Sequence, residues 1–170
     1  MQRPCDRSPR PAHDPNAHRM TSHFLFVAGA LRERSSRESA DLQLQHHLWG
    51  LRSALIADNL ARYLEAGSCG WVYVLKEGLC ARFVISSGVL PFERLDPLVR
   101  DELRSEARYG YVTIGEVCRW TSSPEHDLPV LRRVLDVSDQ AELARRFNLG
   151  MHRLTAEQHD ALLAAISGAA

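Results

Sequence analysis

The sequence predicts an α+β domain in which about five to six mixed strands curl into a small open β-barrel flanked by helices. The chain has 170 residues, of which 45% are hydrophobic, enough for one domain with a sizeable core. Short apolar runs with strand composition are interspersed with segments whose apolar residues recur at helical spacing. Residues 1–22 hold many prolines and arginines and little to bury, so we expect a disordered basic tail followed by one domain over residues 23–170.

Strands are predicted where apolar residues run together or alternate between turn residues. A tight turn through Glu77 and Gly78 joins two of them into a hairpin. Gly115 indicates a bulge or a close backbone approach within the longest one. The predicted strands cover residues 23–29, 71–75, 79–86, 109–120 and 151–154.

Helices are predicted from apolar residues three and four positions apart and from capping residues. Ser53 is the expected N-cap and Gly67 the stop of the clearest helix, and Thr155 with Gln158 forms a capping box before the last one. The polar run 30–45 is expected to be a loop or short helix with its charges in water, and the ambiguous segment 128–137 to be extended. The predicted helices cover residues 53–66, 98–107, 139–147 and 156–166.

Composition limits the classes of function. The 21 basic and 21 acidic residues cancel, so any polyanion must be bound by a local patch, and all basic residues but Lys76 are arginines. No apolar run approaches the length of a membrane span and no signal peptide is recognisable, so we expect a cytoplasmic protein with no membrane partner. A zinc site built from the set Cys69, Cys80, Cys118 and His126 matches no common ligand spacing, and we expect no metal or cofactor.

Enzymatic motifs are absent from the sequence. It contains no nucleophile elbow, phosphate-binding glycine loop, dinucleotide fingerprint or zinc-binding HExxH helix. His46, His47 and His126 could serve a hydrolase, but no nucleophile accompanies them, and surface or loop histidines are the simpler interpretation. We therefore expect a protein that is not an enzyme.

The stretch HHLWGLRS stands out because it sets Trp49, Gly50 and Arg52 directly before a predicted helix. Backbone N–H groups at a helix N-terminus favour anions, so Arg52 is a candidate phosphate contact. Trp49 is either a core anchor or the wall of a site that stacks on a planar ligand.

Other arginines gather in two places. Arg32 and Arg34 follow the first strand, whereas Arg145, Arg146 and Arg153 bracket a break at Gly150. If the sheet brings these segments together, they form a basic rim around an aromatic pocket. For each arginine alone, a solvated position or an intramolecular ion pair is the simpler alternative.

The order of several short motifs resembles the EVE and YTH branch of PUA-like domains. These motifs are the strand HFLFVAG, LWG at the entry to a helix, LEAG before the strand WVYVL, the strand ARFVISSG, and the C-terminal LARRFNLGMHRLTAEQHDALLAAI. The resemblance spans residues 23–166. It implies a small barrel with a pocket that receives one nucleobase taken out of its stack.

The resemblance also implies roles for particular residues. Trp49 would be one wall of an aromatic cage beside Gly50, and Phe92, with Leu90 nearby, stands where a second aromatic wall is expected. Backbone groups of the segment Ala28, Gly29 and Ala30 would contact the base edge. Such a protein captures a modified, methylated base in DNA or RNA, and in a restriction system it would need a partner nuclease. The alternative is a PUA-like RNA-binding protein whose affinity ignores base modification and follows RNA shape.

Overall fold

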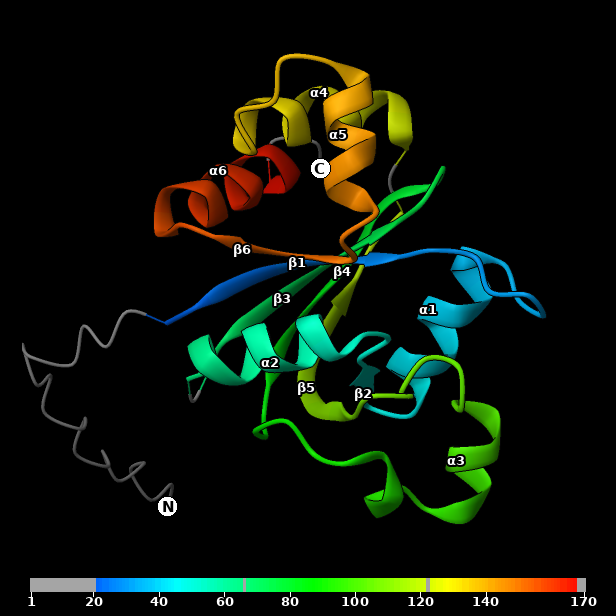
Figure 1. Ribbon diagram of the computed structural model, residues 1–170. Coiled ribbons are helices and arrows are strands. Elements are labelled where there is room, and N and C mark those ends of the chain that lie inside the picture. Colours follow the sequence, from blue (N-terminus) through cyan, green and yellow to red (C-terminus); the bar gives the residue numbers. More distant parts are fainter. Residues whose placement is uncertain (1–20, 66, 122, 168–170) are drawn as a thin grey trace, which may run out of the picture.

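The computed structural model describes residues 21–65, 67–121 and 123–167. Six strands form one mixed, strongly curved sheet in the order β2-β5-β4-β3-β1-β6, which amounts to a half-barrel (Figure 1). Strands β1 and β3 run parallel, and the other neighbouring strands are antiparallel. The strands are β1 (His23–Ala28), β2 (Leu48–Gly50), β3 (Cys69–Val74), β4 (Gly78–Ile85), β5 (Tyr111–Arg119) and β6 (Met151–Leu154). The predicted α+β class is therefore confirmed.

Helices cover both faces of the sheet (Figure 1). Three of them, α4, α5 and α6, lie on one face, and α1 and α2 lie on the opposite face. The short α3 packs beside β2, beyond the edge of the sheet. The helices are α1 (Ser36–Gln45), α2 (Ala54–Tyr63), the 3-10 turn η1 (Phe92–Arg94), α3 (Pro97–Glu102), α4 (Pro124–Val134), α5 (Gln140–Phe147) and α6 (Ala156–Ser167).

Alternation along β1 divides the core into two clusters, because successive side chains of a strand point to opposite faces. Phe24 and Phe26 are buried against the helices α1 and α2. Leu25 and Val27 are buried against α4, α5 and α6. Strand β1 is thus covered on both faces, as its continuous apolar run predicts.

The five predicted strands are confirmed to within two residues at each end. The expected irregularity near Gly115 is also present: Val84 pairs with Gly115, whereas Arg82 pairs with Cys118, so β5 carries an extra residue there. Strand β2 was not predicted. It is only three residues long, too short for an alternating pattern to be visible in the sequence.

The segment 128–137 is mostly helical, so the extended piece predicted there is wrong. Helix α4 begins with Pro124 in its first turn and has acidic residues near its start and Arg132 and Arg133 in its last turn. This arrangement complements the helix dipole. Leu131 and Val134, three residues apart, are both buried against the sheet. Helical spacing continues through the segment although Pro129 lies inside it.

The polar run 30–45 contains helix α1, and the expectation that its charges face water is only partly right. Ser35 and Glu38 form a capping box at its start. Arg37 pairs with Glu77 at 2.6 Å. Helix α2 begins after the predicted N-cap Ser53 but ends at Tyr63, three residues earlier than expected.

The predicted tail falls almost entirely outside the described residues, which begin at residue 21. Ser22 is buried, and its carbonyl accepts a hydrogen bond from the Cys69 N–H at 3.0 Å. The capping box of Thr155 and Gln158 is present at the start of α6. No helix within the described ranges is long and apolar enough to cross a membrane.

Candidate functional site

Trp49 lies in the middle of β2 and is only 4% exposed. Its ring centroid lies 5.6 Å from that of Phe26 and 5.8 Å from that of Phe83. Both ring pairs are tilted, an arrangement that aromatic pairs prefer. Trp49 is therefore part of the core. It also borders a small pocket.

This pocket, here called the Trp49 pocket, lies where β1, β2, α1 and α2 meet the turn before β6. Its volume is about 30 Å³, close to the volume of one water molecule in the liquid. The Ile56 side chain reaches the turn, because a Cβ added to Gly150 would lie 3.0 Å from its Cδ1 atom. The pocket is lined by Phe26, Val27, Gln43, Trp49, Gly50, Arg52, Ile56 and Gly150.

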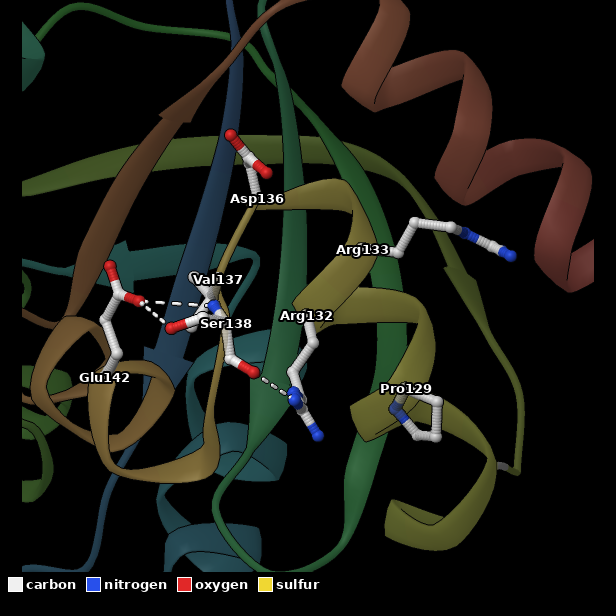
Figure 2. Close-up of a pocket in the computed structure, with 7 residues that line it drawn as sticks. All are labelled: Pro129, Arg132, Arg133, Asp136, Val137, Ser138 and Glu142. Carbon is white, nitrogen blue, oxygen red and sulfur yellow. Dashed lines mark hydrogen bonds between the residues drawn. The ribbon is translucent and has the colours of Figure 1, made fainter.

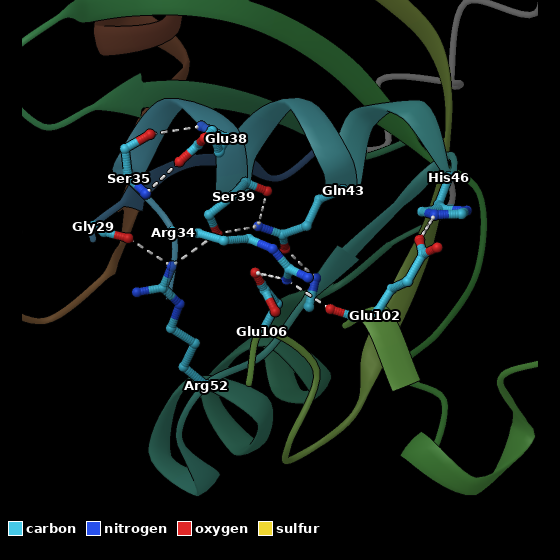
Figure 3. A network of polar contacts seen from close by, with 11 residues as sticks. Gly29, Arg34, Ser35, Glu38, Ser39, Gln43, His46, Arg52, Glu102 and Glu106 are labelled. Carbon is cyan, nitrogen blue, oxygen red and sulfur yellow. Dashed lines mark hydrogen bonds and ion pairs between the residues drawn. The ribbon is translucent and has the colours of Figure 1, made fainter. Parts of the chain in front are cut away.

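Arg52 is a half-buried wall of the Trp49 pocket. Its Nη2 donates to the Gly29 carbonyl at 2.9 Å and to the Ser39 hydroxyl at 3.2 Å (Figure 3). Burial lowers the pKa of its guanidinium, and the negative charge of Glu106 acts in the opposite direction. Arginine remains charged at neutral pH all the same. Arg52 is thus a fixed cationic donor inside the fold, where the sequence suggested a phosphate contact.

Gln43 closes the pocket from α1, and both ends of its amide are hydrogen-bonded. Its Nε2 donates to the Ser39 carbonyl at 3.1 Å, and its Oε1 accepts from the Gly50 N–H at 2.8 Å. A Cβ on Gly50 would lie 2.5 Å from the backbone of Glu106. The absence of a side chain at Gly50 therefore lets the Glu106 backbone pack directly against β2. Sequence reasoning missed Gln43, since α1 was not securely predicted, and it missed the aromatic wall Phe26.

The last residue of β1 and the residue after it both have their carbonyl groups occupied. The Ala28 carbonyl accepts from the Leu75 N–H at 3.0 Å, and the Gly29 carbonyl accepts from Arg52. Ala30 is exposed. Gly29 therefore reaches the pocket indirectly, by holding the guanidinium that lines it.

Phe92 and Leu90 do not line the Trp49 pocket. Both pack against a separate cluster that includes Leu48 and Tyr111, and Leu90 forms a β-bridge with Tyr111. Leu48 and Trp49 are neighbours in β2, so their side chains point to opposite sides. The loop at residues 86–89, together with the end of α2, borders another cavity of about 270 Å³.

The six arginines suggested for phosphate contact fall into two groups. Besides Arg52, two are held by partners within the fold. Arg34 donates to the Glu102 carbonyl at 2.6 Å and pairs with Glu106 at 3.1 Å, and Arg146 donates to the Leu135 carbonyl at 3.0 Å.

The other three have no ion pair within the part of the chain that the structure describes: Arg32, Arg145 and Arg153. The Arg153 guanidinium lies 4.3 Å from the centroid of the Tyr63 ring, on α2.

A larger cavity, of about 510 Å³, lies on the other face of the sheet between α4 and α5 (Figure 2). It is lined by Pro129, Arg132, Arg133, Asp136, Val137, Ser138 and Glu142. Arg132 donates to the Ser138 carbonyl, and Glu142 accepts from the Ser138 N–H at 3.2 Å. Its lining mixes arginines with carboxylates, which does not favour binding of a phosphate. The lining contains no aromatic side chain on which a base could stack.

Two of the three histidines considered for hydrolysis contact carboxylates. His46 contacts Glu102 at 2.8 Å, and His126 contacts Asp127 at 3.0 Å in the first turn of α4. His47 is exposed. Among the described residues, no serine, threonine or cysteine side chain is hydrogen-bonded to any of these three histidines.

A different group of side chains of metal-ligating types comes together at the start of β1. Potential ligand atoms of His23, Cys69 and His159 lie within 4.8 Å of one another. This group shares only Cys69 with the zinc site considered from the sequence. The two imidazole rings are stacked, with centroids 3.7 Å apart and planes 15° apart. Because an imidazole lone pair lies in the ring plane, two nearly parallel rings cannot both aim at one ion. The Trp71 indole also donates to His159 Nδ1 at 3.0 Å.

No protein-family model matches the chain, and no curated protein does. Solved structures do match. The human THYN1 protein, in complex with DNA containing 5-methylcytosine, is 19% identical, with a TM-score of 0.55, over 85% of this chain and 96% of its own. A hypothetical protein from Leishmania major is 17% identical, with a TM-score of 0.55, over 84% of this chain and 92% of its own.

A third match, the DUF55 domain of human thymocyte nuclear protein 1, is 20% identical, with a TM-score of 0.53. It covers 84% of this chain and 97% of its own. These likenesses concern the fold. The chain has the PUA-like fold of the EVE type, as the resemblance in its sequence implies.

Proposed function

We propose that this protein binds nucleic acid without catalysing a reaction and captures one nucleobase in the Trp49 pocket. The observation that carries the proposal is the pocket wall, in which the rings of Trp49 and Phe26 adjoin the fixed guanidinium of Arg52. Aromatic side chains stack on bases at about 1–3 kcal/mol per base, and a guanidinium donates to base edges. The shared fold with the THYN1 protein, which was solved with DNA containing 5-methylcytosine, supports the same choice of ligand.

A base requires the pocket to open. At about 30 Å³ it holds a water molecule, whereas a base has several times that volume. Ile56 is the wall best able to move, since it is half-buried at the start of α2 and packs its Cδ1 atom on Gly150. Binding therefore couples extrusion of the base, which costs a few kcal/mol in a duplex, to a shift of one aliphatic side chain.

Modification of the base fits the same pocket. A methyl group adds apolar contact with the Trp49 and Phe26 rings, and one buried carbon discriminates by about 1–3 kcal/mol. The preference for a methylated base should thus lie between about fivefold and about 150-fold.

The three arginines without an ion pair, Arg32, Arg145 and Arg153, are the proposed phosphate contacts. Arg153 lies in β6 and its guanidinium is above the ring of Tyr63 in α2. Tyr63 is seven residues after Ile56, which is about 10 Å along the helix at 1.5 Å per residue. A strand whose base enters the Trp49 pocket would then pass the Arg153 guanidinium. In a restriction setting, a separate nuclease would cut the bound DNA.

A blocking substitution tests the proposal. Ile56→Trp should fill the pocket and reduce the affinity for an oligonucleotide with one methylated base about tenfold or more, measured by fluorescence anisotropy. Leu55→Trp is the matched control, because Leu55 is the neighbouring residue and is 64% exposed. Equal affinities of the two variants would contradict capture in this pocket.

The RNA alternative gives a different result in the same titration. A protein that follows RNA shape should bind methylated and unmethylated strands equally and prefer folded RNA, with a steep dependence on salt. Ile56→Trp would then leave its affinity unchanged.

A further inference from the structure

Leu149 is a large apolar side chain that is 59% exposed at the rim of the Trp49 pocket. It directly precedes Gly150, which lines the pocket. A Cβ added to Gly150 would lie 3.0 Å from the Cδ1 atom of Ile56, the wall that has to move before a base can enter. Leu149 therefore stands beside the opening, on the solvent side of the pocket wall.

The turn that carries Leu149 is held in place by hydrogen bonds and by packing. The Gly150 carbonyl accepts from the Val27 N–H of β1 at 2.9 Å, and the Gly150 N–H donates to the Phe147 carbonyl at 3.0 Å. Phe147 is buried, and its ring centroid lies 4.5 Å from that of Tyr73. Leu149 thus projects from a fixed backbone, which loses little conformational freedom when the side chain contacts a ligand.

Two of the proposed phosphate contacts bracket Leu149 along the chain. Arg145 lies four residues before it, in α5, and Arg153 lies four residues after it, in β6. Both are exposed, and neither has an ion pair within the described ranges. An apolar side chain between two cations matches a nucleic-acid strand, in which charged phosphates border a stack of base faces.

A second exposed leucine at the rim lacks these neighbours. Leu55, on α2, is 64% exposed. The nearest arginine along the chain is Arg52, whose guanidinium is bound inside the fold by the Gly29 carbonyl and the Ser39 hydroxyl. Leu55 also precedes the wall that has to move. The charges and the fixed backbone therefore single out Leu149.

We infer that Leu149 is a wedge that enters the base stack of a double-stranded nucleic acid and fills the gap left by the base captured in the Trp49 pocket; the inference rests on the proposed function. Extruding a base from a duplex breaks its stacking on both neighbours. Apolar side chains, leucine and methionine among them, insert between base steps in other complexes and contact the separated bases. A base in a single strand is already easily unstacked, so a wedge gains little there. A duplex is thus the substrate class that uses Leu149.

The test compares two forms of one oligonucleotide with a central 5-methylcytosine, the single strand and the strand annealed to its complement. The full-length wild-type chain should bind the duplex at least as tightly as the single strand. Leu149→Ala should weaken duplex binding about tenfold and change the affinity for the single strand less than about twofold. Leu149→Met keeps an apolar side chain of similar length and should retain the duplex affinity.

Leu98→Ala is the matched control, because Leu98 is 78% exposed on α3 and does not line the Trp49 pocket. It should leave both affinities unchanged. An equal loss for both forms in Leu149→Ala, no loss for either, or a wild-type preference of about tenfold for the single strand would overturn the wedge. Base capture would still stand if Ile56→Trp weakened binding to both forms. Binding of both forms that ignores Ile56→Trp would overturn base capture itself.

Discussion

The Arg153 guanidinium lies 4.3 Å from the centroid of the Tyr63 ring, which joins strand β6 to helix α2 across the surface. Both side chains are exposed, Tyr63 to 44%. A cation above an aromatic face at an exposed site gains about 0.5–1 kcal/mol. The ring therefore limits the positions of the guanidinium without neutralising its charge, which leaves Arg153 available to a phosphate.

Replacing Arg153 by Ala should weaken binding to every oligonucleotide by a similar factor. The slope of log affinity against log salt concentration should fall by about one, because one phosphate contact is lost. Arg104→Ala is the control, since Arg104 is an exposed arginine two residues after the end of α3 that pairs with Asp101. An equal effect of both substitutions would mean that the protein responds only to total charge.

Truncating Trp49 should destabilise the fold as well as the site. Its ring is buried against Phe26 and Phe83, and large-to-small changes of this kind cost about 3–5 kcal/mol. Trp49→Ala should reduce the free energy of unfolding in urea by this amount, and Trp49→Phe by clearly less. A loss below about 1 kcal/mol for Trp49→Ala would show that the ring does not belong to the core.

Gly50 should tolerate no side chain. A Cβ there would lie 2.5 Å from the carbonyl carbon and oxygen of Glu106, and backbone atoms yield less readily than side chains. We expect Gly50→Ala to lower the free energy of unfolding by about 1–3 kcal/mol. Gly88→Ala has open space around the new Cβ and should be neutral in the same denaturation experiment. Equal stability of both variants would contradict the close packing of Glu106 on β2.

The stacked pair His23 and His159 should make the fold sensitive to acid. Burial lowers the pKa of His159 to about 4 and also lowers the pKa of His23. In the unfolded chain both return to about 6.5. The folded state therefore binds fewer protons, so its stability is complete above pH 6.5 and declines as the pH falls towards 4.

Urea midpoints between pH 7 and pH 4 measure this decline. His159→Gln should flatten it, because glutamine does not titrate and its carbonyl can still accept from the Trp71 indole. His47→Asn removes an exposed histidine at φ 52°, a conformation that asparagine accepts, and should leave the decline unchanged. A decline that persists in full in His159→Gln would assign it to other groups.

The fold was largely predictable because its strands and helix caps are determined by short stretches of neighbouring residues. The run at β1, the hairpin turn through Gly78 and the N-cap Ser53 each depend on a few neighbouring residues. Helix α4 was missed because the segment 128–137, mostly apolar and with an internal proline, suits an extended conformation equally well.

The candidate site was predictable only in part, because its remaining walls depend on tertiary packing. The stretch around Trp49 and Arg52 could be singled out from its composition. Nothing local in the sequence indicates that Gln43 reaches the Gly50 N–H or that Phe26 stands beside Trp49. Phe92, chosen as the second wall, faces another cluster, because the side chains of a strand alternate and Leu48 rather than Trp49 points towards it.

Fluorine NMR of a bound oligonucleotide tests base capture most directly. A strand carrying 5-fluorocytosine at the target position, and a parallel strand carrying 2-fluoroadenine, report whether a base lies between aromatic rings. Capture in the Trp49 pocket predicts that the wild-type protein displaces the resonance of one of these bases and that Ile56→Trp abolishes the displacement. A resonance that stays at its free position in both strands, while the wild-type protein is bound to them, would contradict the proposal.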